Sequence, residues 1–439
     1  METLAAWIDA QYGRAARLMR ASISAVDVVK ARPGFGQEIR AARGSVIATR
    51  VLASWDPEPD YFFHWFRDSS VVMDALRVLY LDGVAGDEAL VDFEDFLRFS
   101  LSLHRLDGRR LVEDPKWRRR IAADFEKFVR GPDELANVRG ASVVAETRVN
   151  PDGTLDISRW ARPQHDGPAT RALAVLRWVR DVALNQPSRT LAGELLRVDL
   201  AFLCSHWHIP SFDIWEEDAG EHYYTLRLTA AALREGGGWL QTQGEDALAR
   251  ECEVAAQAIA PRLDAFWDAH DAIYRSRTLA SGAPSTKELD ISVILAAIHA
   301  GGHDTAHTVD DERMQSTLAR LEAFFDRQYP INRMRDPRFG PALGRYPGDV
   351  YFSGGAYFFS TLGAAEFCFR AGLQGDRGSW IAHGDAYLET VRKYTLPDGA
   401  MSEQFDQRTG EQTSARHLAW SYAGFITCVA ARRAATNGS

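Results

Sequence analysis

Two kinds of helical run alternate along the 439-residue chain, and this alternation constrains the fold more than any other feature. In the first kind, apolar residues recur every three or four positions, as do Leu191, Leu195 and Val198. Such a stripe buries one face of a helix and leaves the other face in water. In the second kind, of which residues 415–431 are an example, the run is apolar on most sides, so protein must surround the helix.

The runs form six pairs, and in each pair the amphipathic run comes first. The amphipathic runs lie at or around residues 4–30, 88–104, 191–202, 248–259, 314–325 and 380–394. The apolar runs lie at residues 66–80, 169–182, 223–233, 291–300, 356–369 and 415–431. This order predicts an all-α fold, in which an outer ring of six helices wraps an inner ring of six. We expect strands only as short pieces near 43–52 and 142–149. We also expect one domain over residues 1–439, since no linker rich in Pro or Ser divides the chain.

Charge and hydropathy exclude some classes of partner. The formal net charge of -9 argues against nucleic acid or an anionic membrane as the main partner. No apolar stretch approaches the 18 residues or so that a membrane span needs. The N-terminus has neither a basic region nor a long apolar region, so we expect no signal peptide and a cytoplasmic location. The sequence leaves open whether the protein is a monomer or a small homo-oligomer.

We expect no metal site and no cofactor. His206 and His208 flank Trp207, but no third ligand is evident, so pocket lining or packing explains the pair better. His303 and His307 have the spacing of a zinc protease, but Asp304 stands where that chemistry requires Glu.

The long connections that lead into the apolar runs carry clusters of Trp, Tyr, Arg, Asp and Glu. These connections lie at residues 55–66, 140–167, 206–217, 333–355 and 395–414. In a double ring of helices they all open at the same end, and long ordered loops usually carry function. Aromatic faces beside Arg and Asp suit a pyranose ring, because the ring stacks and its adjacent hydroxyls bind in pairs. We therefore expect a sugar site at one mouth of the barrel.

The acidic pair Glu216 and Glu217 follows Trp215 and precedes an apolar run. One interpretation is helix capping, because a helix N-terminus attracts negative charge. The other is a carboxylic acid held against an indole, where desolvation keeps a general acid protonated near neutral pH. The residues of this segment alone do not decide between the two.

Five segments together resemble glycoside hydrolase family 15, the glucoamylases and glucodextranases. They are Tyr-Phe-Phe-His-Trp-Phe-Arg-Asp at 61–68, Trp-Ala-Arg-Pro-Gln-His-Asp-Gly-Pro-Ala at 160–169, Asp-Ile-Trp-Glu-Glu at 213–217, Gly-Arg-Tyr-Pro-Gly-Asp-Val-Tyr at 344–351, and the run from Ser-Glu-Gln-Phe to Trp-Ser-Tyr-Ala at 402–423. They occur in the family's order and span most of the chain. The resemblance implies an (α/α)6 barrel and an inverting exo-α-glucosidase. Unlike members that carry an N-terminal β-sandwich domain, this chain is expected to have none, and no separate carbohydrate-binding domain.

The resemblance also assigns roles to residues. It implies that Glu216 is the general acid and Glu403 the general base. Glu217, Arg67, Asp68, Arg345 and the backbone near Trp215 would hold the terminal glucose, and Tyr61 and Trp65 would face the reacting ring. Trp160 and Arg162 would reach the next sugar, Trp420 would flank the base, and Ser414 could hydrogen-bond Glu403. Tyr346, Asp349 and Tyr351 complete the predicted sugar-binding set. An inverting pair should stand about 6.5–9.5 Å apart, to leave room for water.

Two departures from the family pattern bear on the substrate. Tyr357 stands where fungal members carry a second Trp, and the stretch 156–159 lacks an aromatic residue. Both places would hold outer sugars. The reading that we favour is release of β-glucose from α-1,4 malto-oligosaccharides. An α-1,6 preference for isomalto-oligosaccharides or dextran, and a non-catalytic glucan-binding protein, are the alternatives.

Overall fold

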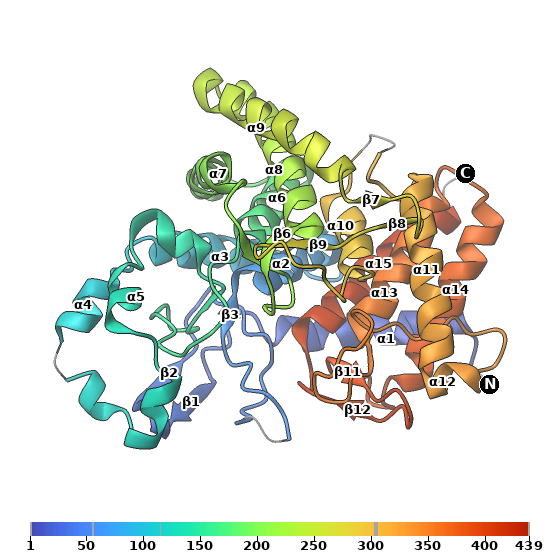
Figure 1. The fold of residues 1–439 in the computed structure, drawn as a ribbon, viewed down its shortest axis with the longest axis horizontal. Coiled ribbons are helices and arrows are strands. Elements are labelled where there is room, and N and C mark those ends of the chain that lie inside the picture. Colours follow the sequence, from blue (N-terminus) through green and yellow to red (C-terminus); the bar gives the residue numbers. More distant parts are fainter. Residues whose placement is uncertain (1, 55–56, 115, 303–305, 438–439) are drawn as a thin grey trace.

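Two concentric rings of helices form the body of the protein (Figure 1). The computed structural model describes residues 2–54, 57–114, 116–302 and 306–437. Within these residues the inner ring consists of α2 (Phe66–Leu81), α6 (Asp166–Asp181), α8 (Tyr223–Thr242), α10 (Ser292–Ala300), α13 (Phe358–Ala371) and α15 (Ala419–Asn437). Each inner helix packs on the next, and α15 closes the ring on α2. The predicted (α/α)6 barrel is confirmed.

The outer helices alternate with the inner ones along the chain, as the sequence predicts. They are α1 (Leu4–Arg20), α3 (Glu88–Leu103), α7 (Gln186–His206), α9 (Asp246–Asp264), α11 (Glu312–Gln328) and α14 (Arg377–Tyr394). The helices of the two rings differ in how much of their surface is buried. Every residue of α13 except Arg370 is buried, whereas α14 buries little more than the stripe through Tyr387, Leu388 and Val391.

Short strands tie together the loops at one end of the barrel. They are β3 (His64–Trp65), β4 (Arg148–Val149), β5 (Ser211–Phe212), β6 (Ala219–His222), β7 (Trp267–Asp268), β8 (Ile273–Tyr274), β9 (Arg277–Leu279), β10 (Ala356–Tyr357), β11 (Gln404–Phe405) and β12 (Gln412–Thr413). Strand β3 pairs with β4, β6 lies between β5 and β9, and β11 lies between β10 and β12, each pair antiparallel. Because β3, β6 and β10 each run directly into an inner helix, the pairings fix the loops above the barrel mouth.

A smaller lobe stands beside the barrel, at the left of Figure 1. It contains the hairpin of β1 (Val29–Arg32) and β2 (Gln37–Arg40), with α4 (Gly108–Glu113) and α5 (Pro132–Ala136). The one-turn helix α12 (Pro330–Arg333) and the 3-10 turns at Pro33–Phe35, Arg118–Arg120, Ala123–Phe128 and Gly140–Ala145 complete the elements. Small apolar clusters hold the lobe separately from the main core. The expectation of a single domain over 1–439 stays a prediction.

Three boundaries predicted from the sequence were wrong. The first helix ends at Arg20 and not near residue 30, because Ala25 and Val28 pack into the small lobe instead of continuing the helical stripe. Residues 43–52 form no strand and make only the isolated bridge from Val46 to Ile23. Of 142–149, only the last two residues are a strand. None of the helices in the described residues is long and apolar enough to cross a membrane.

Candidate active site

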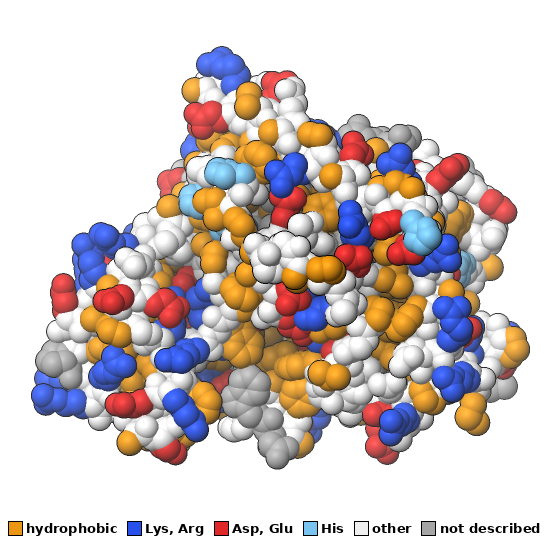
Figure 2. Space-filling view, viewed as in Figure 1, with side chains coloured by type: hydrophobic (Ala, Val, Ile, Leu, Met, Phe, Trp, Pro, Cys, Tyr) orange, Lys and Arg blue, Asp and Glu red, His pale blue; other side chains and the backbone are white. Residues whose placement is uncertain are grey.

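One cavity of about 200 Å³ opens at the barrel mouth, and the loops before the inner helices line it. Figure 2 shows a hollow in the middle of this face, with hydrophobic side chains on its walls and acidic and basic side chains close by. Twelve of the residues predicted from the sequence line the cavity: Tyr61, Trp65, Arg67, Asp68, Trp160, Trp215, Glu216, Glu217, Arg345, Tyr351, Glu403 and Trp420. The structure therefore brings both predicted catalytic carboxyls into one chamber.

Three predicted sugar-binding residues do not line this cavity. The Arg162 guanidinium instead forms buried ion pairs with Glu146 and Asp156, both at 2.7 Å. Asp349 accepts two hydrogen bonds of 2.7 Å from the Arg345 guanidinium, and Tyr346 donates to Glu217. Each of the three thus contacts charged groups of the protein, and Asp349 and Tyr346 reach the cavity only through Arg345 and Glu217.

Glu216 lies in the tight loop 213–218 between β5 and β6, and not at the head of a helix. Helix α8 begins only at Tyr223, so the helix-capping interpretation of the acidic pair was wrong. The backbone of Glu216 has φ of 65°, in the left-handed region that a side chain rarely adopts. Its N–H donates to the carbonyl of Asp213 at 2.9 Å, which closes the turn. Backbone strain of this kind concentrates at functional sites.

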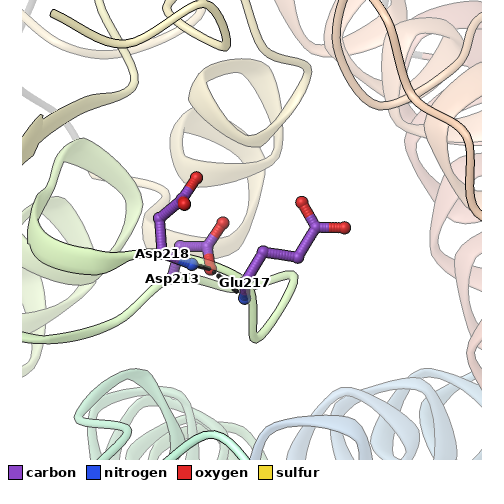
Figure 3. Close-up of side chains that lie close together, drawn as sticks. All are labelled: Asp213, Glu217 and Asp218. Atoms are coloured by element: carbon purple, nitrogen blue, oxygen red, sulfur yellow. Dashed lines mark hydrogen bonds between the residues drawn. The ribbon is translucent and has the colours of Figure 1, made fainter.

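Asp213 holds the acid loop in this shape (Figure 3). One of its carboxylate oxygens accepts the backbone N–H of Glu217 at 2.7 Å and that of Asp218 at 3.0 Å. Its other oxygen pairs with Arg277 at 2.9 Å, and Asp213 is almost fully buried. The same guanidinium reaches Asp218 and Asp290. The loop is therefore built around one buried cation.

Carboxylate oxygens of Asp213, Glu217 and Asp218 lie within 4.8 Å of one another, close enough to share a metal ion. Cationic side chains already compensate these charges, because Lys287 contacts Glu217 at 2.7 Å and Asp218 at 2.9 Å, beside Arg277. We therefore assign the cluster to loop structure.

The two histidine pairs considered as metal ligands give no support for a site. The ring of His206 stacks on Phe202 with centroids 4.1 Å apart, and His303 lies outside the described residues.

Three N–H donors converge on the Glu216 carboxyl. The indole of Trp65 donates at 2.9 Å and Arg67 at 3.1 Å to one oxygen, and the indole of Trp160 donates to the other. None of these donors can accept a proton. The carboxyl group is therefore held in place from two sides, and the oxygen that accepts from Trp160 keeps one site at which it can hold a proton.

Arg67 is the centre of charge on the acid side. Its guanidinium reaches Asp166 at 3.3 Å, Asp68 at 3.4 Å and Glu216 at 3.1 Å. Burial disfavours its charge, but the three carboxylates outweigh burial and raise the pKa of Arg67 well above its ordinary value. Burial also raises the pKa of both Asp68 and Asp166 to about 6, against the opposing effect of Arg67. Asp68 lines the cavity, where its carboxyl can bind sugar hydroxyls.

Glu403 lies immediately before β11, where hydroxyl groups surround its carboxyl. The hydroxyl of Ser414 donates to one oxygen, and the hydroxyl of Tyr61 lies 3.3 and 3.5 Å from the two oxygens. Tyr61 is itself 2.8 Å from the hydroxyl of Tyr351. Burial raises the pKa of Glu403 to about 7, although Ser414, Arg345 and Tyr61 lower it. Ser414 has φ of 62°, so the base side also contains a residue in the left-handed region.

Stacked aromatic rings close the inner end of the cavity. Trp420 stacks on Phe359 with centroids 4.5 Å apart, and Phe359 lies 5.9 Å from Trp215. Trp420 and Phe359 also line a second cavity of about 30 Å³ among the inner helices, so they form a partition between the two. The first cavity is therefore blind at this end.

Sequence reasoning missed several residues of the site. The sequence predicts Phe359 within a buried helix, where it lies, but Phe359 also lines the cavity, as do Ala48, Ile214 and Leu418. Tyr357, expected beside outer sugars, lines the same cavity. Lys287 gave no signal, because it is an isolated lysine in a polar loop. The role of Asp213 had only a general signal, because Asp side chains often accept nearby backbone N–H groups in turns.

Comparison with known proteins places this site in a family context. The model of the glycosyl hydrolases family 15 matches residues 144–383 and 379–430. A glucoamylase of Blastobotrys adeninivorans is 27% identical, over 90% of this chain and 68% of its own. A probable glucoamylase of Schizosaccharomyces pombe is 28% identical, over 90% and 86%.

Solved structures share the fold at lower identity. The family 15 glucoamylase of Hypocrea jecorina is 22% identical with a TM-score of 0.79, over 98% of this chain and 72% of its own. The glucoamylase of Saccharomycopsis fibuligera is 19% identical with a TM-score of 0.76, over 99% and 96%.

Proposed function

Because the chain belongs to the glycosyl hydrolases of family 15, we propose that it is an inverting exo-α-glucosidase that releases β-glucose from the non-reducing ends of α-1,4 malto-oligosaccharides. Family membership makes it a glycoside hydrolase. One observation carries the finer proposal. Glu216 and Glu403 line one small cavity that stacked aromatic rings close at its inner end. A closed cavity accepts the end of a sugar chain and excludes its middle.

In the proposed reaction the two carboxyls act on opposite faces of the terminal glucose. Glu216 donates its proton to the glycosidic oxygen as the bond from that oxygen to the anomeric carbon breaks. A water molecule attacks the anomeric carbon from the other face and loses a proton to the Glu403 carboxylate. The leaving sugar keeps the proton of Glu216, and the released glucose is the β anomer. Exchange with solvent then returns a proton to Glu216 and removes one from Glu403.

The other lining residues would hold the terminal glucose in a fixed position between the two carboxyls. Arg67 with Asp68, and Arg345 with Glu217, offer paired charged groups to adjacent hydroxyls. The partition of Trp420 and Phe359 offers an aromatic surface to the carbon face of the ring. Ser414 would position Glu403 through its hydroxyl. Arg162 would act on the next sugar only indirectly, since its guanidinium is held by Glu146 and Asp156.

Proton NMR of the anomeric signals, recorded while the enzyme digests maltotriose or isomaltotriose, tests this proposal. Initial β-glucose from maltotriose is the expected result. Initial α-glucose would contradict the role of Glu403 as a base. Faster release from isomaltotriose would change the linkage to α-1,6, the alternative that Tyr357 raised. Binding of either sugar without turnover would favour a glucan-binding protein.

Oligomeric state and cytoplasmic location stay predictions.

A further inference from the structure

The guanidinium of Arg148 lies over the two indoles that donate to Glu216. Arg148 is 2% exposed and does not line the catalytic cavity. Its Cζ atom lies 3.7 Å from the ring centroid of Trp160 and 4.8 Å from that of Trp65. The Nε1–H groups of these two rings reach the two oxygens of the Glu216 carboxyl. One buried cation therefore contacts both rings that hold the proposed acid.

Strand pairing places Arg148 beside Trp65. In the antiparallel pair of β3 and β4, Arg148 is the direct partner of Trp65, so the two side chains lie on the same face of the pair. The Cζ atom of Arg148 also lies 4.0 Å from the ring centroid of Phe63, and Phe63 meets Trp65 edge to face with centroids 5.6 Å apart. The guanidinium is therefore in contact with three aromatic rings.

Asp156 holds another edge of this guanidinium. The Nε–H of Arg148 donates to the Asp156 carboxylate at 2.9 Å, and one terminal nitrogen donates to the hydroxyl of Ser158 at 3.2 Å. The other terminal nitrogen, Nη1, is buried with no hydrogen-bond partner in the described part of the chain. Burial lowers the pKa of Arg148, against the opposing effect of Asp156. A buried cation with an unsatisfied nitrogen is unfavourable, so the ring faces must supply attraction that hydrogen bonds do not.

A guanidinium on the face of an indole has two consequences for that ring. Stacking restricts the tilt of the ring, and the positive charge draws electron density from it, which makes its N–H a stronger donor. N–H donors favour the ionised form of a carboxyl group, the form that Glu216 reaches as its proton passes to the glycosidic oxygen. We propose that Arg148 is a positioning residue, which holds both indoles in the orientation in which they donate to Glu216 as the proton leaves. This inference rests on the proposed function, in which Glu216 is the acid.

Arg148→Met removes the cation and keeps a side chain of similar length. We expect kcat on maltotriose to fall about tenfold, a loss that one or two cation–π contacts can give. α-Glucosyl fluoride needs no acid, because fluoride leaves without protonation, so its kcat should stay within about twofold of the wild type. An unchanged ratio of the two rates would overturn the proposal. If Arg148→Met does not fold, Arg148→Lys provides the same test, because it keeps a charge opposite Asp156 but loses the planar group that stacks.

Arg130→Met is the matched control. Arg130 is also 2% exposed and pairs with Glu146 at 2.9 Å, and among the described residues its guanidinium lies over no aromatic ring. This variant therefore breaks a buried ion pair of the same kind without touching the indoles. We expect it to leave the ratio of the maltotriose and fluoride rates unchanged. A fall in this ratio equal to that of Arg148→Met would mean that any buried arginine of this region matters, and would contradict the proposal.

A double variant separates positioning from a general loss of folded protein. In Glu216→Gln no proton passes from residue 216, so adding Arg148→Met should cause no further loss of kcat on maltotriose. Equal losses from Arg148→Met in the wild-type and Glu216→Gln backgrounds would overturn the proposal, because unfolding lowers both rates alike.

Hydrogen exchange of the indole N–H groups, followed by NMR, tests the same contacts without turnover. Trp65→Phe and Trp160→Phe assign the two signals. We expect both protons to exchange about tenfold faster in Arg148→Met than in the wild type, and at the wild-type rate in Arg130→Met. Unchanged exchange in Arg148→Met would overturn the inference. A wild-type protein that hydrolyses no glucoside would contradict the proposed function and leave this measurement intact.

Discussion

The loop that carries Glu216 and the hairpin that carries Glu403 share a backbone feature but differ in whether charged or neutral groups contact the carboxyl. Each contains a residue in the left-handed region, Glu216 at φ 65° and Ser414 at φ 62°. Buried charges hold the acid loop, because Asp213 pairs with Arg277 and Glu216 pairs with Arg67. In the described residues no Lys or Arg forms an ion pair with Glu403, whose direct side-chain partners are hydroxyls.

In the proposed reaction this difference would aim the acid and strengthen the base. Glu216 must be aimed at a glycosidic oxygen, and charged groups together with indole donors fix its carboxyl in position. Glu403 must take a proton from water. Burial raises the pKa of Glu403 to about 7, although Ser414, Arg345 and Tyr61 lower it, and this makes Glu403 a stronger base than an exposed carboxylate. Left-handed backbone at a non-glycine residue costs about 1–3 kcal/mol, so the surrounding contacts must hold both turns.

The largest expected effects come from the two carboxyls themselves. Glu216→Gln and Glu403→Gln should each lower kcat on maltotriose by about 10²–10⁴-fold, because each removes a proton transfer and keeps the shape of the side chain. α-Glucosyl fluoride separates them, since fluoride leaves without protonation. We expect Glu216→Gln to cleave the fluoride at a rate within about tenfold of the wild type, because only acid catalysis has been lost.

Glu403→Gln should remain slow on both substrates, because water still needs a base. Circular dichroism and thermal unfolding of both variants provide the control for folding. If Glu403→Gln were the variant that recovers on the fluoride, the roles of the two carboxyls would be reversed. Near-normal kcat in either variant would remove that residue from the mechanism.

A second expected effect tests whether buried charge is what holds the acid loop. Asp213→Asn keeps an oxygen for the backbone N–H groups of Glu217 and Asp218 but loses the charge opposite Arg277. We expect kcat on maltotriose to fall by about 10- to 100-fold. Breaking a buried ion pair lowers the stability of the loop by several kcal/mol at most, and Arg277 keeps its ion pairs with Asp218 and Asp290.

Asp406 provides the matched control on the base side. Its carboxylate accepts the backbone N–H groups of Arg408 and Thr409 at 2.7 and 2.8 Å. No cation among the described residues forms an ion pair with it, so Asp406→Asn, which keeps an oxygen for both N–H groups, should leave kcat within about twofold of the wild type. Equal losses in both variants would mean that the turn, and not the charge, matters.

The ring architecture could be predicted from the sequence, because helix burial leaves a periodic trace in each run. The motifs likewise predicted most cavity residues, such as Arg67 and Trp420. The side-chain partners could not be predicted. The resemblance assigns Arg162 to a sugar, but its guanidinium pairs with Glu146, and only the fold brings these two side chains together. Likewise, Lys287 contacts Glu217 across 70 residues of chain. The left-handed backbone of Glu216 was equally hidden, since it depends on Asp213 being fixed by Arg277.

The smallest expected effect concerns the hydroxyl that Ser414 donates to Glu403. Ser414→Ala keeps the Cβ atom and the left-handed backbone, so it removes only the hydrogen bond that stabilises the ionised carboxylate. The pKa of Glu403 should then rise further above its ordinary value. A general base is active only when ionised, so the acid limb of kcat/KM, which reports the free enzyme, should move upward from pH 7 by about one pH unit.

Ser353→Ala is the control for this change, because its hydroxyl bonds Gln404 and Thr413 in the same hairpin and does not contact Glu403. At pH 8 or above we expect Ser414→Ala to approach the wild-type rate, whereas at pH 6 it should be about tenfold slower, as follows from a shift of one pH unit. An unchanged acid limb would mean that another group governs it. Asp68 and Asp166 are the groups to examine in that case, since burial raises the pKa of each to about 6.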